Sequence, residues 1–151
     1  MIERIKDSVT KKQIAREVLE QLTDWFENPE GREGLIGESG NLIMVADIED
    51  GKPRGFTCLK ETGKDTVEIA VIGVLSGYHR KGIGRALFEE AKKIAVDAGY
   101  SFIQVKTVKY GMYESYDKTN LFYKGLGFKE FELMPMFWDE LNPCQIYVMA
   151  L

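Results

Sequence analysis

One apolar run followed by a glycine-rich turn constrains the fold of this chain most. Every residue from Ile69 to Leu75 is apolar, and the basic, glycine-containing segment 77–85 separates this run from residues 82–98, which carry apolar residues at helical spacing. A strand that is apolar without alternation is typical of a sheet covered on both faces. The pattern predicts a strand, a helix and a second strand at 101–108 that runs parallel to the first.

The N-terminal third predicts one helix and one loop. Thr10 and Gln13 match a capping box and precede apolar residues at helical spacing, so we expect an amphipathic helix that ends near Asn28 and Pro29. Residues 31–41 contain four glycines, which favours a mobile surface loop beside a binding site.

The remaining segments add strands on both sides of the central unit. Residues 42–48 and 55–60 flank an Asp-Gly turn and predict a hairpin. A short helix is expected near 118–125, followed by a strand from Phe128 and a last strand at 145–151. The order of elements indicates an α/β fold with a sheet of mixed direction.

Length and composition fit one ordinary globular domain over residues 1–151. The chain is 44% hydrophobic and 29% charged, and its formal net charge of -4 disfavours nucleic acid as the main partner. It shows no signal-peptide core and no membrane span, and Cys58 and Cys144, outside any C-x-x-C pair, are expected to be buried thiols. We therefore expect a cytoplasmic protein.

The turn before the second helix has the features of an anion site. Gly82 and Gly84 allow a tight turn and a close approach of the backbone, and the first free N–H groups of the helix point to the same place. Arg80, Lys81 and Arg85 add positive charge around it. The alternative is a turn whose glycines serve packing only and whose cations are solvated.

Two nucleotide-binding motifs are excluded at this turn. A Walker A loop needs lysine after its second glycine, where Ile83 follows Gly82. A dinucleotide fingerprint needs a small residue three positions after Gly84, where Leu87 stands. The sequence therefore points away from ATP and NAD.

Two segments resemble the GCN5-related N-acetyltransferases, the GNAT family. His79 to Gly84 is similar to the acetyl-CoA-binding pattern R/Q-x-x-G-x-G/A of that family, with His79 in place of the usual Arg or Gln. Asn120 to Phe128 is similar to the family's helix-to-strand corner. The resemblance covers nearly the whole chain and implies a mostly antiparallel sheet with a central parallel pair, flanked by helices.

The resemblance implies which residues hold acetyl-CoA. The backbone of Val74 and Leu75 would pair with the pantetheine arm, Gly73 would permit a bulge, and an N–H near Val74 would stabilise the oxyanion on the thioester. The diphosphate would lie on the turn, whose residues are His79, Arg80, Lys81, Gly82, Ile83, Gly84 and Arg85. No metal is implied.

Three further residues receive roles from the resemblance, each with an alternative. Glu68 would be the general base, directly or through water, or else a strand-end residue facing solvent. Tyr123 would donate its proton to the CoA thiolate, or only pack in its helix. Asn120 would bind pantetheine, or cap its helix. His79, which lies at the diphosphate turn, would contact the cofactor or be exposed and is not expected to be the base.

The acceptor side is less defined by the sequence. Tyr110, Tyr113, Tyr116 and the segment 137–140 combine aromatic faces with carboxylates, which suits a cationic amine, although the aromatic residues can equally be core and the acids a solvated turn. Cys144 could be a reactive thiol, but direct transfer needs no acyl-enzyme.

The function implied is acetyl-CoA-dependent acetylation of a primary amine, namely a small amine, a peptide N-terminus or a lysine. The alternative is a CoA sensor or interaction module without turnover. The resemblance also allows a homodimer, although no exposed apolar stripe in the sequence demands one.

Overall fold

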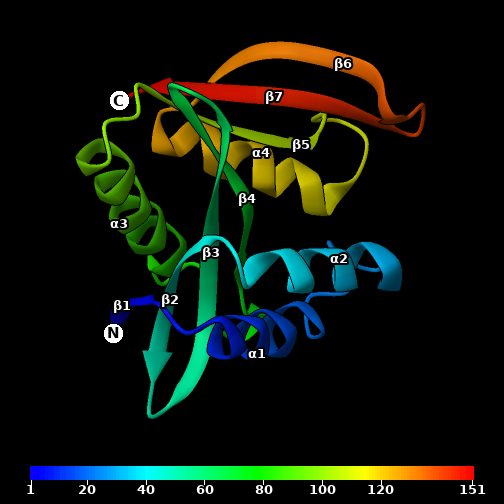
Figure 1. Ribbon diagram of the computed structural model, residues 1–151. Coiled ribbons are helices and arrows are strands. Elements are labelled where there is room, and N and C mark those ends of the chain that lie inside the picture. Colours follow the sequence, from blue (N-terminus) through cyan, green and yellow to red (C-terminus); the bar gives the residue numbers. More distant parts are fainter.

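The computed structural model describes residues 1–151 and shows a seven-stranded sheet with helices on both faces (Figure 1). In chain order the elements are β1 (Ile2–Ile5), α1 (Ser8–Leu19), α2 (Pro29–Ser39), β2 (Ile43–Glu49), β3 (Lys52–Gly63), β4 (Thr66–Val74), the short 3-10 helix η1 (Ser76–Tyr78), α3 (Ile83–Asp97), β5 (Phe102–Val108), α4 (Glu114–Leu126), β6 (Lys129–Asp139) and β7 (Asn142–Ala150). The strand order is β1-β2-β3-β4-β5-β7-β6, and only β4 and β5 are parallel. The mixed α/β fold is confirmed.

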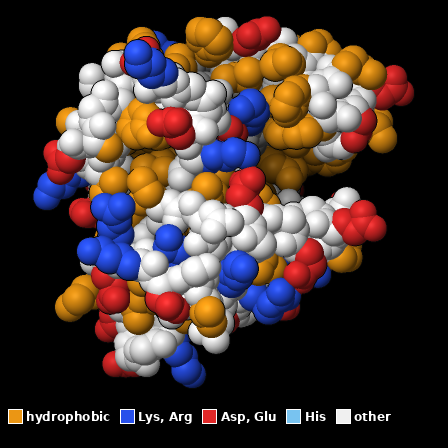
Figure 2. All heavy atoms as spheres, viewed as in Figure 1, with side chains coloured by type: hydrophobic (Ala, Val, Ile, Leu, Met, Phe, Trp, Pro, Cys, Tyr) orange, Lys and Arg blue, Asp and Glu red, His pale blue; other side chains and the backbone are white.

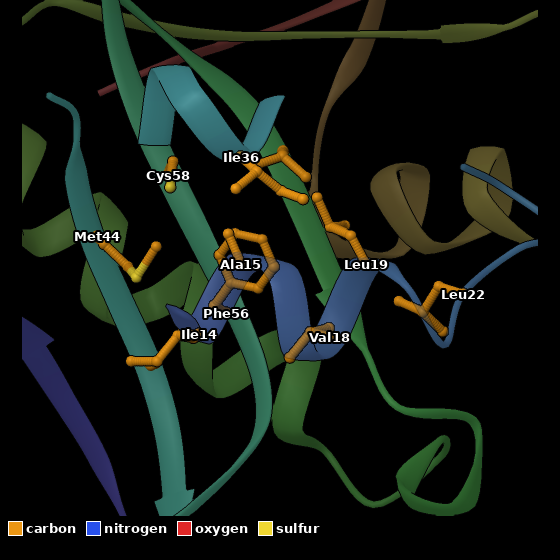
Figure 3. Close-up of a cluster of buried hydrophobic side chains, with 11 residues drawn as sticks. Ile14, Ala15, Val18, Leu19, Leu22, Ile36, Met44, Phe56 and Cys58 are labelled. Atoms are coloured by element: carbon orange, nitrogen blue, oxygen red, sulfur yellow. The ribbon is translucent and has the colours of Figure 1, made fainter. Parts of the chain in front are cut away.

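Two hydrophobic clusters cover the two faces of the sheet. On one face, residues of α1 and α2, such as Val18 and Ile36, pack on Phe56 of β3 (Figure 3). On the other face, α3 and α4 pack on β3, β4, β5 and β7. Val71 of β4 belongs to the first cluster and Ile69 to the second, so the central strand is buried on both sides, as its composition predicts.

A bulge interrupts β4 at a different place from the one expected. Cys58 of β3 pairs with Val71 and Leu59 pairs with Ile69, so Ala70 is the extra residue. Gly73 pairs regularly, and a Cβ built on it would lie 2.9 Å from Cδ1 of Leu22. The prediction of a bulge at Gly73 is therefore wrong, and the glycine instead lets the end of α1 approach β4.

The N-terminal helices also differ from the prediction. Asp7 caps α1 and accepts a hydrogen bond from the amide of Thr10, so the helix starts before the expected capping box and stops at Leu19. Residues 29–39 form α2 where a loop was expected. The Asn28 cap and burial of Ile36 outweigh the low helix propensity of the glycines.

The C-terminal part contains longer elements than predicted. α4 begins at Glu114, and β6 extends through Asp139, so that it includes Phe137 and Trp138. β6 is an edge strand in which every residue except Met134 is exposed, including Phe131 and Leu133, so an exposed apolar stripe does exist. The short edge strand β1 was not predicted. Every helix is too short or too polar to cross a membrane.

Candidate active site

The parallel strands separate to form a cavity. β4 and β5 pair only at Thr66 with Phe102, Val67 with Ile103 and Glu68 with Gln104. Beyond that point, residues 69–74 and 105–108 line a cavity of about 930 Å³, together with residues from the α1–α2 segment, α3, α4 and the β6–β7 hairpin. The surface is hollowed between α2 and the hairpin, where hydrophobic side chains gather (Figure 2).

One end of the cavity is a cluster of free backbone donors. The amide N–H groups of residues 80–85 have no hydrogen-bond acceptor in the protein, and no side chain caps α3. Arg80 (φ 62°) and Gly82 (φ 79°) take left-handed conformations, which curl these amides toward one point. Such an arrangement at a helix N-terminus is built for an anion.

The two glycines of this turn have different structural reasons. Gly82 has open space around it, so its positive φ is what requires glycine. Gly84 has an ordinary helical conformation, but a Cβ there would lie 3.1 Å from the ring of Phe122 in α4. The turn and the Asn120–Phe128 segment, which were identified separately in the sequence, thus touch at Gly84.

Only part of the basic turn faces the cavity. Arg80 and Arg85 line it, and the Arg85 guanidinium also donates to the carbonyl of Gly125 at 3.1 Å. Lys81 does not line it, and its ammonium lies 5.5 Å from the centroid of the Tyr78 ring. The expectation for the Lys81 side chain is therefore not supported.

The open edge of β4 presents backbone groups to the cavity. The N–H of Leu75 donates to the carbonyl of Arg54 at 2.8 Å, so by the antiparallel alternation Ile72 and Val74 point their backbone groups away from β3. Leu75 also accepts from the amide of Tyr78, so both of its backbone groups are occupied. The N–H of Leu75 is therefore not available to a ligand, and the free N–H groups at this end of β4 belong to Ile72 and Val74.

His79 lies in the cavity wall, where it bridges two segments. Its Nε2 donates to the carbonyl of Val74 at 2.6 Å, which fixes a hydrogen on that nitrogen. Its ring meets Trp25 edge to face, with centroids 5.9 Å apart. The side chain is exposed, which was one of the two alternatives expected for His79.

Tyr123 contributes a protonated hydroxyl to the cavity wall. The side chain is 4% exposed and lines the cavity. Its hydroxyl has no hydrogen-bond partner in the protein, and this oxygen is not completely enclosed. Burial raises the pKa of Tyr123 above its ordinary value. The phenol is therefore neutral around pH 7 and can act as a proton donor.

The family of the chain follows from a sequence comparison. The model of the acetyltransferase (GNAT) family matches residues 14–128, which contain the cavity-lining strands, the turn and Tyr123. The chain belongs to the GNAT family. A comparison with curated proteins finds none that matches.

Solved GNAT structures share the fold. A GNAT-family protein from Desulfovibrio desulfuricans is 20% identical, with 99% of both chains covered and a TM-score of 0.84. An aminoglycoside 6'-N-acetyltransferase complexed with coenzyme A is 21% identical, covering 99% of this chain and 96% of that one, with a TM-score of 0.77. A ribosomal-protein alanine N-acetyltransferase from Escherichia coli is 18% identical, covering 99% and 94%, with a TM-score of 0.78.

Asn120 has a different role in this GNAT chain from the two expected. It lies inside α4, is fully buried and does not line the cavity. Its Nδ2 donates to the carbonyls of Val108 (2.8 Å) and Tyr116 (2.7 Å), and its Oδ1 accepts from the hydroxyl of Tyr147 at 2.6 Å. Asn120 therefore ties α4 to β5 and β7, does not cap the helix and has its side-chain amide engaged within the protein.

Glu68 lies where β4 and β5 part, but it does not line the cavity. Its Oε1 is 3.0 Å from the ammonium of Lys106, which does line it. Nearby, Cys144 is fully buried, and burial raises the pKa of its thiol to about 11. Cys144 is therefore a structural thiol, as first expected, and its protonated state disfavours an acyl-enzyme.

Three segments meet in the part of the cavity where the sequence led us to expect the acceptor, which is called the acceptor half below. Trp25 and Phe26 come from the α1–α2 segment, Tyr116 from α4, and Trp138 and Asn142 from the hairpin. Sequence reasoning assigned Trp25 and Phe26 to a helix face and missed Lys106, since no local pattern marks them.

Of the acceptor residues that were predicted, only Tyr116 and Trp138 face this cavity. Tyr113 instead donates to the carbonyl of Leu141, and Tyr110 is an exposed residue outside the lining. Asp139, which was expected to attract an amine, binds the amide of Leu141 and the side chain of Asn142 within the hairpin turn.

Proposed function

We propose that this chain is an acetyl-CoA-dependent N-acetyltransferase that transfers an acetyl group directly to a primary amine. The observation that carries the proposal is the row of free N–H groups at residues 80–85, which adjoins the open edge of β4. This combination offers a diphosphate site and an extended strand edge for the pantetheine arm in one continuous cavity. The coenzyme A complexed with the aminoglycoside acetyltransferase of the same fold supports this choice of cosubstrate.

The cosubstrate would be held mainly by backbone. The diphosphate would accept hydrogen bonds from the amides of the turn, with Arg80 and Arg85 adding charge. Pantetheine would pair with the free backbone groups of Ile72 and with the N–H of Val74, whose carbonyl already accepts from His79. The N–H of Val74, which points into the cavity, is then the candidate donor to the oxyanion that forms on the thioester carbonyl.

The reaction needs two proton transfers. The amine nitrogen forms a bond to the thioester carbon, the carbon–sulfur bond breaks, and the CoA thiolate takes the phenolic proton of Tyr123. The proton lost by the amine would reach Glu68 through water, because the carboxylate lies behind Lys106 and not at the cavity wall. No covalent enzyme intermediate is required.

Thiol release is the decisive test. The purified chain is mixed with acetyl-CoA and a panel of amines, and free CoA is followed with a thiol-reactive dye. Both protein cysteines are fully buried, so the native chain gives little background. We expect CoA release that depends on the amine. Binding of CoA by calorimetry without release for any amine would favour the sensor or interaction module, and no binding at all would overturn both functions.

We also propose that two copies associate through β6 in a cytoplasmic enzyme. Phe131 and Phe137 are exposed on this edge strand and offer apolar surface to a second copy. If two β6 strands pair in antiparallel orientation, the Lys129 end of one lies beside the Asp139 end of the other. Sedimentation should give a dimer that Phe131→Glu converts to a monomer. A monomeric native chain would contradict it.

A further inference from the structure

The acceptor half of the cavity is unusual in its charge. The chain has 24 Asp and Glu residues against 20 Lys and Arg, yet no carboxylate lines the cavity, whereas Arg80, Arg85, Lys106 and Lys118 do. A site for a polycationic amine would be expected to present carboxylates to it. The charge of this cavity therefore selects against such acceptors.

Lys106 is the cation that serves the acceptor half. Ile69 of β4 and Val105 of β5 face the cluster under α3 and α4. Side chains alternate along a strand, so their neighbours Glu68 and Lys106 face the opposite side of the sheet, where α1 and α2 lie. This side is away from α3, the helix that follows the diphosphate turn. Lys118 is 65% exposed and lies on the outer part of α4. Arg80 and Arg85 belong to the diphosphate end.

The ammonium of Lys106 has donor capacity left for a ligand. It binds Oε1 of Glu68 at 3.0 Å and contacts Oε1 of Gln104 only at 3.5 Å, while an ammonium has three N–H groups. Glu68 sits behind it and orients it, and the Lys106 side chain is 20% exposed, toward the cavity. A carboxylate on the acceptor could accept a hydrogen bond from the remaining N–H of this ammonium.

The Lys106 ammonium lies 6.0 Å from the centroid of the Phe137 ring, other aromatic residues line the same cavity, and hydrogen bonds join two segments of its wall. Trp25, Phe26 and Trp138 line the cavity. The indole of Trp25 donates to the carbonyl of Ser115 at 3.2 Å, and the hydroxyl of Tyr116 donates to the carbonyl of Trp25 at 3.0 Å. These bonds tie the α1–α2 segment to α4 and favour a small acceptor over a polypeptide.

We infer that the acceptor is a small amine that also carries a carboxylate and an apolar or aromatic side chain, that is, a free amino acid of this type, with Lys106 binding the carboxylate. The inference rests on the proposed acetyl transfer at the same cavity. Lys106 also favours the reactive form of the acceptor, because a nearby cation lowers the pKa of an amine. Lys106 is a specificity-determining residue in this assignment, and Glu68 positions it.

The test compares three ligands that differ in one group. L-phenylalanine, L-phenylalaninamide and phenethylamine share the ring and the amine, but only the first has a carboxylate. Each is titrated calorimetrically into the chain saturated with CoA, so that no turnover occurs, and each is then used as acceptor with acetyl-CoA. We expect binding and kcat/KM to favour phenylalanine at least about tenfold, and spermidine to be poorer still.

Three variants separate the assignment from general damage. Lys106→Met should reduce the preference for phenylalanine to about twofold or less, and Lys106→Arg should retain most of it. Lys93→Met, on the exposed face of α3, should keep the native preference. If the native chain prefers phenethylamine or spermidine, or if the preference survives in Lys106→Met, the inference is wrong. Carboxylate-selective binding without CoA release would instead leave the acceptor assignment standing and overturn the proposed reaction.

Discussion

The two halves of the cavity are built from different materials. The proposed cofactor half consists mainly of backbone, namely the free amides of residues 80–85 and the open edge of β4, with Arg80 and Arg85 adding charge. The acceptor half consists of side chains from three distant segments, including Trp25, Lys106 and Trp138. Backbone presents the same groups whatever the side chains are, so the first half suits one shared cosubstrate and the second half can be changed residue by residue.

This difference also decides what a substitution does. In the cofactor half the critical positions are glycines and the residues that hold the helices in place, so damage acts through backbone position. In the acceptor half a substitution should change preference among acceptors and leave the cosubstrate bound. The following predictions test that division, starting with the largest effect.

Asn120 should be a stability residue although it belongs to a family motif. Asn120→Leu leaves the carbonyl of Val108 and the hydroxyl of Tyr147 without partners in the core and removes the second donor to the carbonyl of Tyr116, which should cost about 3–5 kcal/mol of unfolding free energy. Urea unfolding measures it.

A milder variant guards against complete unfolding. Tyr147→Phe removes only one of the three hydrogen bonds and should cost about 1–2 kcal/mol while CoA affinity stays near native. A loss of CoA affinity at unchanged stability in either variant would move Asn120 back into the cofactor half.

Gly84 should be the most sensitive position for cosubstrate binding. Gly84→Val places a Cβ about where the ring of Phe122 lies and displaces the start of α3 from α4, so we expect CoA affinity to fall about 100-fold. Calorimetry with CoA measures this, with circular dichroism as the check on folding.

The chain offers a matched control and a rescue for this effect. Gly77→Ala, in the same turn region, adds a methyl group into open space and should bind CoA normally. Phe122→Ala combined with Gly84→Val should recover part of the lost affinity, because the clash is removed. Equal losses in Gly77→Ala and Gly84→Val would contradict a specific contact.

Tyr123 should act on the rate and not on binding. Tyr123→Phe should lower kcat about 10- to 100-fold with nearly unchanged affinity for acetyl-CoA, because the proton donor to sulfur is lost and the ring remains. Its stability should stay native, since the hydroxyl has no partner in the protein. Unchanged turnover would remove Tyr123 from the mechanism.

The pH dependence gives a second readout for Tyr123. Burial raises its pKa above the ordinary value of about 10, so the acid form persists through the usual assay range. The native kcat should therefore show no decline attributable to this residue up to about pH 9.5.

The sequence predicted the cofactor half of the cavity better than the acceptor half. The β-α-β unit and its glycine turn were predictable because a buried strand, a turn and an amphipathic helix each leave a local pattern. The acceptor half was predicted only in part: Tyr116 and Trp138 were named from the sequence, but Trp25 and Lys106 were not, because only the fold brings them to the same cavity. Local propensity also failed at α2, where the Asn28 cap and the burial of Ile36 outweigh the glycines.

Resemblance to a family was informative about position more than about contacts. The turn and Tyr123, which the resemblance singled out, both line the cavity. The resemblance did not reveal that the N–H and the carbonyl of Leu75 both form hydrogen bonds within the protein, or that the bulge lies at Ala70. These details depend on strand register, which one residue of slip changes completely.

A pair of buried threonines gives the smallest and most local test of where the cavity wall lies. Thr57 and Thr107 are 1% and 4% exposed, but the hydroxyl of Thr57 donates to the carbonyl of Val71 at 2.9 Å, whereas that of Thr107, in a cavity-lining residue, has no partner. Thr57→Val should cost about 1 kcal/mol in urea unfolding, and Thr107→Val should cost nothing or stabilise by up to about 1 kcal/mol. If both variants lose the same stability, the Thr107 hydroxyl has a partner in solution. If Thr107→Val instead weakens CoA binding, this hydroxyl belongs to the cofactor half.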